Sequence, residues 1–383
     1  MNSQGKKSRM ANMELLRIVS MMLVVVLHYL DKGGLLTTLS NKETPWASYL
    51  PWLLEAFAIS AVNCYMMLTG YFLASSSFKV SRLVRTVLQI WFYSVIIGVI
   101  AGCFGLFPEE GLCIHYLLSL VLPISMNHYW FMTAYVFMYL FTPFIAAGVR
   151  KLDKKQMQII LMLLLLVFCT VKSIAPIRLG ADNKGYDCIW YLCVCIVGVY
   201  VRLYGIPFAD SVKKGAAVWA GASLAIFGFT MVFRMAYIFT GKLGAMLMIC
   251  YDYNHILTFV ASLGLFGMFE KMRLPEAGRM SKWILRIAPY TLGVYLLHEH
   301  LALRFRWQGW LGAEYAGSGP WLVLWLIAAV CTVMAAGIAA DLLRSLAFGG
   351  LHRILLHVPP YRKLTEMLFR VDRTMAQKQH GGV

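Results

Sequence analysis

Residues 13–30 read MELLRIVSMMLVVVLHYL, an apolar segment in which Glu14, Arg17 and His28 are the only acidic, basic or imidazole side chains. About 20 such residues in an α-helix are enough to cross the hydrocarbon core of a bilayer, which is ~30 Å thick. The segment lacks the small-residue cleavage site of a signal peptide, so we expect it to be retained as a membrane-spanning helix.

The rest of the chain repeats this apolar pattern. Its 383 residues are 60% hydrophobic and 14% charged, whereas a soluble domain carries about 25% charged residues. The sequence therefore predicts an all-α fold, a polytopic transmembrane helix bundle of about ten spans. We expect these spans near residues 13–31, 47–73, 84–106, 129–148, 156–172, 188–204, 215–236, 251–269, 285–303 and 320–343.

The positive charge of the chain follows this expected topology. The net charge is +17, and Lys and Arg concentrate in alternate connections along the whole chain. This distribution is the positive-inside rule, and it predicts that both termini are cytoplasmic. We therefore expect a multi-pass protein of the plasma (cytoplasmic) membrane, whose basic residues contact anionic membrane lipid and no nucleic acid.

No linker or low-complexity stretch marks a second folded domain. We expect one transmembrane domain over residues 1–350, followed over 351–383 by a basic amphipathic cytoplasmic tail on the inner membrane surface. The apolar stretch 111–125 is too short to span, so we place it at the outer interface. The nine cysteines form neither a disulfide framework nor a zinc-binding pattern, so we expect no metal.

Arg17 and His28 lie eleven positions apart on the first expected helix. That spacing is three turns plus about 20°, so both side chains share one face and are separated by about 16 Å along the axis. The topology places Arg17 at the cytoplasmic end and His28 in the outer half. This arrangement fits an anionic cofactor that enters from the cytoplasm and a reaction deeper in the membrane, although Arg17 alone also fits a snorkelling side chain.

Other polar residues of the expected spans suggest binding sites. Arg82 and Arg85 are neighbours on a helix surface, and paired guanidinium groups suit phosphate, although the positive-inside rule also explains them. On one continuous helix over 47–73, Glu55 and Thr69 would share a face within about 40°. A carboxylate inside a span indicates a functional site, unless Glu55 is simply solvated at the outer interface.

Histidines gather at one expected depth of the membrane. The topology places six of the nine near its outer half, namely His28, His115, His128, His255, His298 and His300. Hydrogen bonds to backbone carbonyls are a sufficient explanation for His115, His255 and His300. His28, His128 and His298 are the better functional candidates.

Several segments resemble, in order, motifs of the acyltransferase-3 family of membrane O-acyltransferases. The opening segment has the family's spacing of Arg, ten residues and His, and SRLVR (81–85) is similar to the basic start of its third helix. NCYMMLTGYFL (63–73) resembles an aromatic-rich stretch that ends in Ser-Gly, with Thr69 where Ser is usual. HYWFMTAYVFMYLFTP (128–143) and APYTLGVYLLHEH (288–300) resemble the His-x-Trp helix start and the late Gly-x-Tyr-x-x-His signature.

The resemblance implies a membrane O-acyltransferase that moves an acyl group from cytoplasmic acyl-CoA to a hydroxyl of an extracytoplasmic or lipid-linked glycan. Acetyl-CoA is the implied acyl donor, bound by Arg17, Arg82 and Arg85. His28 is the implied general base, and Arg17, Tyr295 and His298 complete the expected catalytic set. The residues that we expect to bind the carbohydrate acceptor are His128, Trp130, Glu55, Asn63 and Thr69.

Two other functions stay open at this point. A secondary transporter or flippase for a lipid-linked sugar would also need about ten spans, but the chain lacks the internal repeat and paired broken helices of such proteins. An inactive relative that acts as a membrane scaffold is the other alternative. The sequence also leaves open the acceptor, acetyl against succinyl transfer, direct against covalent-intermediate transfer, and the oligomeric state.

Overall fold

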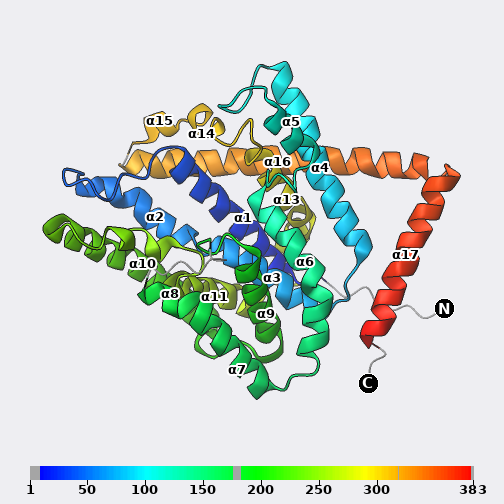
Figure 1. Cartoon of the computed structure of the whole chain (residues 1–383), viewed down its shortest axis with the longest axis horizontal. Helices are drawn as coiled ribbons and strands as arrows, with labels where there is room; N and C mark the ends of the chain where they lie inside the picture. The colour runs from blue at the N-terminus through cyan, green and yellow to red at the C-terminus, as the bar shows by residue number, and fades with distance from the viewer. Residues whose placement is uncertain (1–8, 176–182, 318, 381–383) are drawn as a thin grey trace.

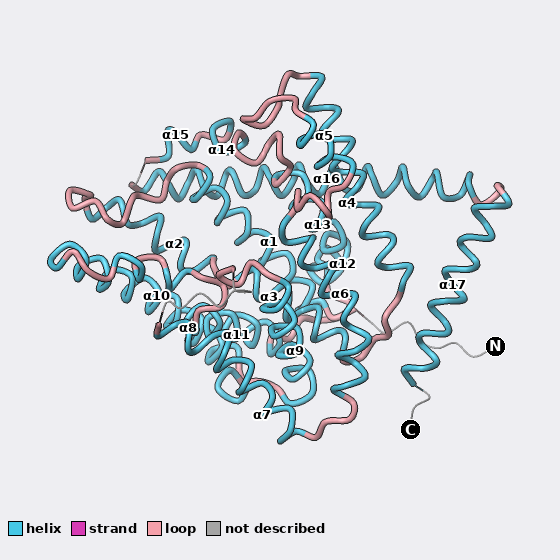
Figure 2. The backbone as a smooth tube through the Cα atoms, in the orientation of Figure 1, coloured by secondary structure: helices cyan, strands magenta, loops and turns pink. Residues whose placement is uncertain are grey.

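The computed structural model describes residues 9–175, 183–317 and 319–380, and all regular secondary structure in these ranges is helical. The expected all-α fold is therefore confirmed (Figure 2). The main helices are α1 (Ala11–Lys32), α2 (Leu50–Ala58), α3 (Ala61–Leu73), α4 (Val80–Cys103), α5 (Ile114–Val121), α6 (Trp130–Val149), α7 (Lys154–Leu165), α8 (Val171–Ile174), α9 (Cys188–Tyr204), α10 (Val212–Thr240), α11 (Ile256–Lys271), α12 (Arg279–Ile287), α13 (Thr291–His298), α14 (Trp307–Trp310), α15 (Ala313–Ala316), α16 (Pro320–Leu355) and α17 (Pro359–His380).

Seven helical segments of the described chain are long and apolar enough to cross a membrane, namely Ala11–Lys32, Leu50–Leu73, Val80–Cys103, Trp130–Val149, Lys154–Ile174, Val212–Thr240 and Trp321–Leu355. Each coincides with one of the ten spans expected from the sequence. The other three expected spans are shorter, because α9 has 17 residues, α11 has 16, and the segment 285–303 is divided between α12 and α13. Most residues of α9 and α11 are buried, so these helices pack inside the bundle.

Helix α1 lies in the middle of the bundle, where it packs against α2, α3, α11, α12, α13 and α16 (Figure 1). Around it, α3 packs closely on α9. Gly70 permits this approach, because a Cβ atom added there would lie 1.8 Å from the carbonyl oxygen of Cys195. The glycine after Thr69 therefore has a packing role, which brings α3 against the wall of the bundle.

The single helix expected over 47–73 is two helices, α2 and α3, separated by a turn at Ile59 and Ser60. Side chains of neighbouring helices bind the carbonyl groups at this break: Trp219 Nε1 donates to Phe57 O at 3.2 Å, and Ser262 Oγ donates to Ser60 O at 3.2 Å. Competition for backbone carbonyls is a known cause of helix breaks. The single-helix geometry behind the expected shared face of Glu55 and Thr69 is therefore wrong.

The C-terminal part of the chain consists of two long helices. Helix α16 has 36 residues, a length of about 54 Å at 1.5 Å per residue, well beyond the ~30 Å of a bilayer core. The tail expected to start at residue 351 therefore begins inside α16. After a short turn, α17 runs at a steep angle to α16 down the side of the molecule (Figure 1) and packs against α4.

Candidate active site

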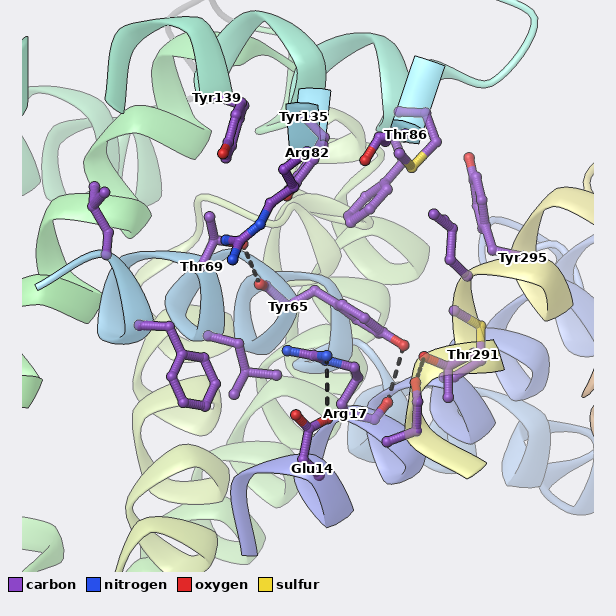
Figure 3. A pocket seen from close by; sticks show the side chains of 18 of the residues that line it. Glu14, Arg17, Tyr65, Thr69, Arg82, Thr86, Tyr135, Tyr139, Thr291 and Tyr295 are labelled. Atoms are coloured by element: carbon purple, nitrogen blue, oxygen red, sulfur yellow. Dashed lines mark hydrogen bonds and ion pairs between the residues drawn. The ribbon is translucent and has the colours of Figure 1, made fainter. Parts of the chain in front are cut away.

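A cavity of about 980 Å³ opens among α1, α3, α4, α6 and α13. Its volume is at the upper end of the range of about 300–1,000 Å³ that is usual for small-molecule sites. Figure 3 shows part of its wall, with Arg17 on α1 facing Tyr65 of α3 and Arg82 of α4. The sequence-predicted residues that line the cavity are Arg17, His28, Thr69, Arg82, Arg85, Trp130 and Tyr295.

One region of this cavity is cationic. Arg17, Arg82 and Arg85 line it as expected, and Arg9 and Arg202 join them. Glu14, only 4% exposed, pairs with Arg9 at 2.8 Å and with Arg17 at 3.1 Å. The arginines therefore outnumber the carboxylate, and this region favours an anionic ligand.

Arg9 and Arg202 are site residues that the sequence interpretation missed. Arg202 lies in the last turn of α9, where its Nη1 donates to the Tyr71 hydroxyl at 2.8 Å. Both arginines belong to the segments in which Lys and Arg concentrate, so their expected membrane side was the available signal. Only the packing of α9 and α1 against α3 brings them to one cavity.

The imidazole of His28 contacts His298 and Glu299, two residues at the end of α13. Its Nδ1 lies 2.9 Å from Nε2 of His298 and 3.2 Å from Oε1 of Glu299. The same carboxylate of Glu299, which is 4% exposed, pairs with the ammonium group of Lys32. Glu299 and Lys32 were absent from the predicted site, although Glu299 stands inside the quoted His-Glu-His sequence.

The hydrogen bonds fix the tautomer of both rings. His298 Nδ1 lies 2.6 Å from the carbonyl oxygen of Val294 and must donate to it, because a carbonyl only accepts. Nε2 of a neutral His298 is then an acceptor, so Nδ1 of His28 carries the hydrogen between the two rings. Nε2 of His28 is left with a lone pair that can take a proton.

The donor atoms of His28, His298 and Glu299 lie within 4.8 Å of one another. Two imidazoles and a carboxylate are ligand types that Zn²⁺ accepts. The Lys32 ammonium nevertheless already pairs with Oε1 of Glu299. The ammonium would repel the two charges of a divalent ion more strongly than the single charge of an imidazolium, so the cluster is better suited to moving a proton than to holding a metal.

Aromatic side chains form the wall near His28. Trp130, Phe131, Tyr253 and Tyr295 all line the cavity. The Trp130 ring stacks on Tyr253 with centroids 6.0 Å apart, and the centroids of Phe131 and Tyr295 are 5.5 Å apart. These residues come from α6, α13 and the segment before α11, so only the fold assembles this wall.

A family model described as an acyltransferase domain matches residues 10–341. The chain belongs to the acyltransferase-3 family. The match spans most of the chain, includes every lining residue named above except Arg9, and ends before α17. The family points to an acyltransferase in the membrane, in agreement with the seven candidate spans. No curated protein and no solved structure matches the chain.

In the described part of this acyltransferase-3 chain, three of the residues predicted to bind the acceptor do not line the cavity. Asn63 bonds to the Tyr253 carbonyl at 2.8 Å and accepts from Trp190 Nε1 at 3.0 Å, so it joins α3 to α9. Glu55 is buried in α2.

His128 is the third of these residues. Its Nδ1 lies 3.1 Å from Ser119 O, and its Nε2 accepts from the Leu301 amide at 3.2 Å. Both ring nitrogens of His128 are therefore bonded inside the protein.

The late family motif contains residues at or beside the cavity as well as a packing position. Tyr295 lines the cavity, and His298 supports His28 from behind. Gly293 instead faces α16 and α4, since an added Cβ would lie 2.3 Å from Asp341 Cβ and 2.6 Å from the Tyr93 hydroxyl. The motif thus keeps α13 close to its neighbours while it presents His298 to α1.

Proposed function

We propose that this acyltransferase-3 protein transfers an acyl group, preferably acetyl, from acyl-CoA to a hydroxyl group of a glycan. The observation that carries the proposal is a single cavity that joins the arginine cluster to His28, whose Nδ1 is bonded by His298 and Glu299. Arginines suit the phosphates of a coenzyme A thioester, and an imidazole suits the proton transfer that a hydroxyl nucleophile needs.

We propose the following reaction. The phosphates of acyl-CoA bind Arg17, Arg82 and Arg85, and its thioester reaches towards His28. Nε2 of His28 takes the proton of the acceptor hydroxyl while that oxygen attacks the thioester carbonyl carbon. The carbon–sulfur bond then breaks, and the imidazolium returns the proton to the thiolate of coenzyme A. The Glu299 carboxylate stabilises the imidazolium during this sequence.

The aromatic wall supports a carbohydrate acceptor. Trp130 and Tyr253 line the same cavity as the proposed base, and a sugar ring presents apolar C–H groups between its hydroxyls that can pack on aromatic side chains. A lipid-linked or growing cell-surface glycan fits a site inside a membrane protein. The arginine end then faces the cytoplasm, where acyl-CoA is made, in the orientation that the positive-inside rule predicts.

The test is mass spectrometry of cell-surface glycans from cells that express the wild type, His28→Ala or an empty vector. A mass gain of one acetyl group only with the wild type would support the proposal and identify the acceptor. A gain with both proteins would retain the acyltransferase and remove His28 as base. Hydrolysis of acetyl-CoA by the purified protein separates an enzyme from a sugar transporter, which would leave the thioester intact.

A further inference from the structure

A second cavity lies beside the arginine end of the first. It has a volume of about 450 Å³ and lies between α4 and the C-terminal helix α17. Its lining consists of Ser77, Lys79, Ser81, Arg82, Arg85, Phe369, Asp372, Arg373 and Ala376. Ser77, Arg82 and Arg85 also line the main cavity, so the two cavities share a wall.

Helix α17 is held in place by one buried carboxylate. Asp372 is 7% exposed, and it accepts hydrogen bonds from both the backbone amide and the hydroxyl of Ser81. Ser81 is in the first turn of α4, where backbone amides lack partners within the helix. Asp372 therefore caps α4 from a distant segment, and this contact aligns α17 along the cavity.

The remaining charge in this second cavity is positive. Lys79, Arg82, Arg85 and Arg373 line it, and none of them forms an ion pair with a carboxylate in the part of the chain that the structure describes. The single carboxylate, Asp372, is engaged by Ser81. Among the described residues, the four cationic side chains therefore lack a carboxylate partner, because Asp372 binds Ser81 at the start of α4. Such a cavity favours a ligand with several phosphate groups.

The aromatic side chain of Phe369 favours one class of phosphate compound over another. Phe369 lines the same cavity and is 53% exposed, so a ring face is available beside the cations. Planar bases stack on such rings. A cavity that offers both cations and an aromatic ring favours a nucleotide, which has phosphates and a planar base, over a lipid headgroup, which lacks a planar base.

We propose that the cavity between α4 and α17 binds the phosphorylated nucleotide end of the acyl donor, with Arg373 as a donor-binding residue and Asp372 as the residue that positions α17. The inference rests on the proposed function, because it identifies where the donor's nucleotide lies. It adds a part of the chain beyond the family match, which ends at residue 341. The thioester arm then passes through the shared wall at Arg82 and Arg85 into the main cavity.

The test uses the full-length protein in detergent and adenosine 3′,5′-bisphosphate, which carries the base and phosphates but no acyl group. We expect the wild type to bind this probe in titration calorimetry and Arg373→Ala to bind it at least 10-fold more weakly. Arg370→Ala is the matched control, because Arg370 is exposed on the same helix and lines neither cavity. Equal affinity of wild type and Arg373→Ala, or no binding by the wild type, would overturn the inference.

Kinetics with two donors separate this inference from the proposed function. Arg373→Ala should raise the KM for acetyl-CoA and leave the KM for S-acetylpantetheine, which lacks the nucleotide, unchanged. An equal loss with both donors would mean that Arg373 is structural. Nucleotide binding that depends on Arg373, without acyl transfer by the wild type, would retain the site and reject the proposed function.

Two further measurements test the ligand and the positioning role. Displacement of the nucleotide by short-chain phosphatidic acid at equal concentration would reassign the cavity to lipid headgroups. Asp372→Ala should weaken nucleotide binding because α17 loses its hydrogen bonds to Ser81 of α4. Asp372→Asn, which keeps one carbonyl oxygen for the Ser81 amide, and Asp372→Glu, which keeps the carboxylate, should restore part of it. Nucleotide binding unaffected by Asp372→Ala would remove the positioning role.

Discussion

Nδ1 of His28, near the end of α1, lies 2.9 Å from Nε2 of His298, at the end of α13. The two residues are 270 positions apart in the sequence. Because the second nitrogen of His298 is bound to the Val294 carbonyl, this contact orients His28 and leaves its Nε2 unprotonated. An imidazole of this kind is ready to act as a base without a prior proton loss.

Replacement of His28 by Ala should reduce acyl transfer about 10²- to 10⁴-fold, the usual contribution of a general base. Binding of the donor should change little, because Arg17 lies about three helical turns from His28 on α1. Transfer is measured with purified protein, and donor binding by titration. His115→Ala is the control, since His115 is exposed and lines neither cavity; transfer by His28→Ala at the control rate would contradict the assignment.

Glu299→Gln keeps the shape of the side chain and removes the charge that faces the His28 imidazolium. We expect kcat to fall about 10²-fold with little change in KM, the pattern of an interaction made in the transition state. The double variant Lys32→Met/Glu299→Gln removes the ammonium that the single change leaves unpaired. Glu314→Gln, at an exposed glutamate, should retain full kcat. If Glu299→Gln also retained full kcat, the Glu299 carboxylate would form the ion pair with Lys32 and have no role in acyl transfer.

Arg17→Ala should raise the KM for acetyl-CoA about 10-fold, because it removes a residue of the cationic region that we propose as a bidentate phosphate ligand. The change also removes a partner of the buried Glu14, so Arg17→Ala/Glu14→Gln tests whether lost stability causes the effect. Higher salt should reduce the difference between wild type and variant. Arg279→Ala, at an exposed arginine outside both cavities, should leave the KM unchanged; the same KM for Arg17→Ala would exclude a donor contact.

Gly293→Ala should destabilise the protein by at least about 1–3 kcal/mol, since the new methyl group would overlap Asp341 and Tyr93. The loss is read as a lower midpoint of thermal unfolding in detergent. Gly148→Ala is the matched control in α6, because no atom lies within 4 Å of its added Cβ. Equal midpoints for the two variants would mean that α13 and α16 can separate at no cost.

Removal of divalent metal should leave acyl transfer unchanged. Lys32 already pairs with the Glu299 carboxylate in the cluster of His28, His298 and Glu299, and its ammonium would repel a divalent ion. Activity is compared before and after dialysis against a chelator, and again after addition of Zn²⁺. A loss on dialysis that Zn²⁺ restores would show that the cluster is a metal site.

Much of the cavity wall was predictable, because membrane residues leave two strong patterns in a sequence. Polar groups are rare inside spans, so Arg17 and His28 stood out, and basic residues gather on one side, so Arg82 and Arg85 did as well. Both patterns are local. They do not show how a helix is rotated against its neighbours, and for this reason His128 and Asn63 were predicted as acceptor ligands although the fold uses both in internal hydrogen bonds.

The sequence by itself determined the helical class, the position of each long apolar segment, the family and two residues of the first helix, Arg17 and His28, that line the main cavity. These properties depend on hydrophobicity and on spacing along one helix. The tertiary structure alone decided that Glu299 and Lys32 join His28, that α2 and α3 are separate helices, and that α17 closes a second cationic cavity. Each of these depends on contacts between segments far apart in the chain, and such contacts are fixed by side-chain packing, which a one-dimensional pattern does not contain.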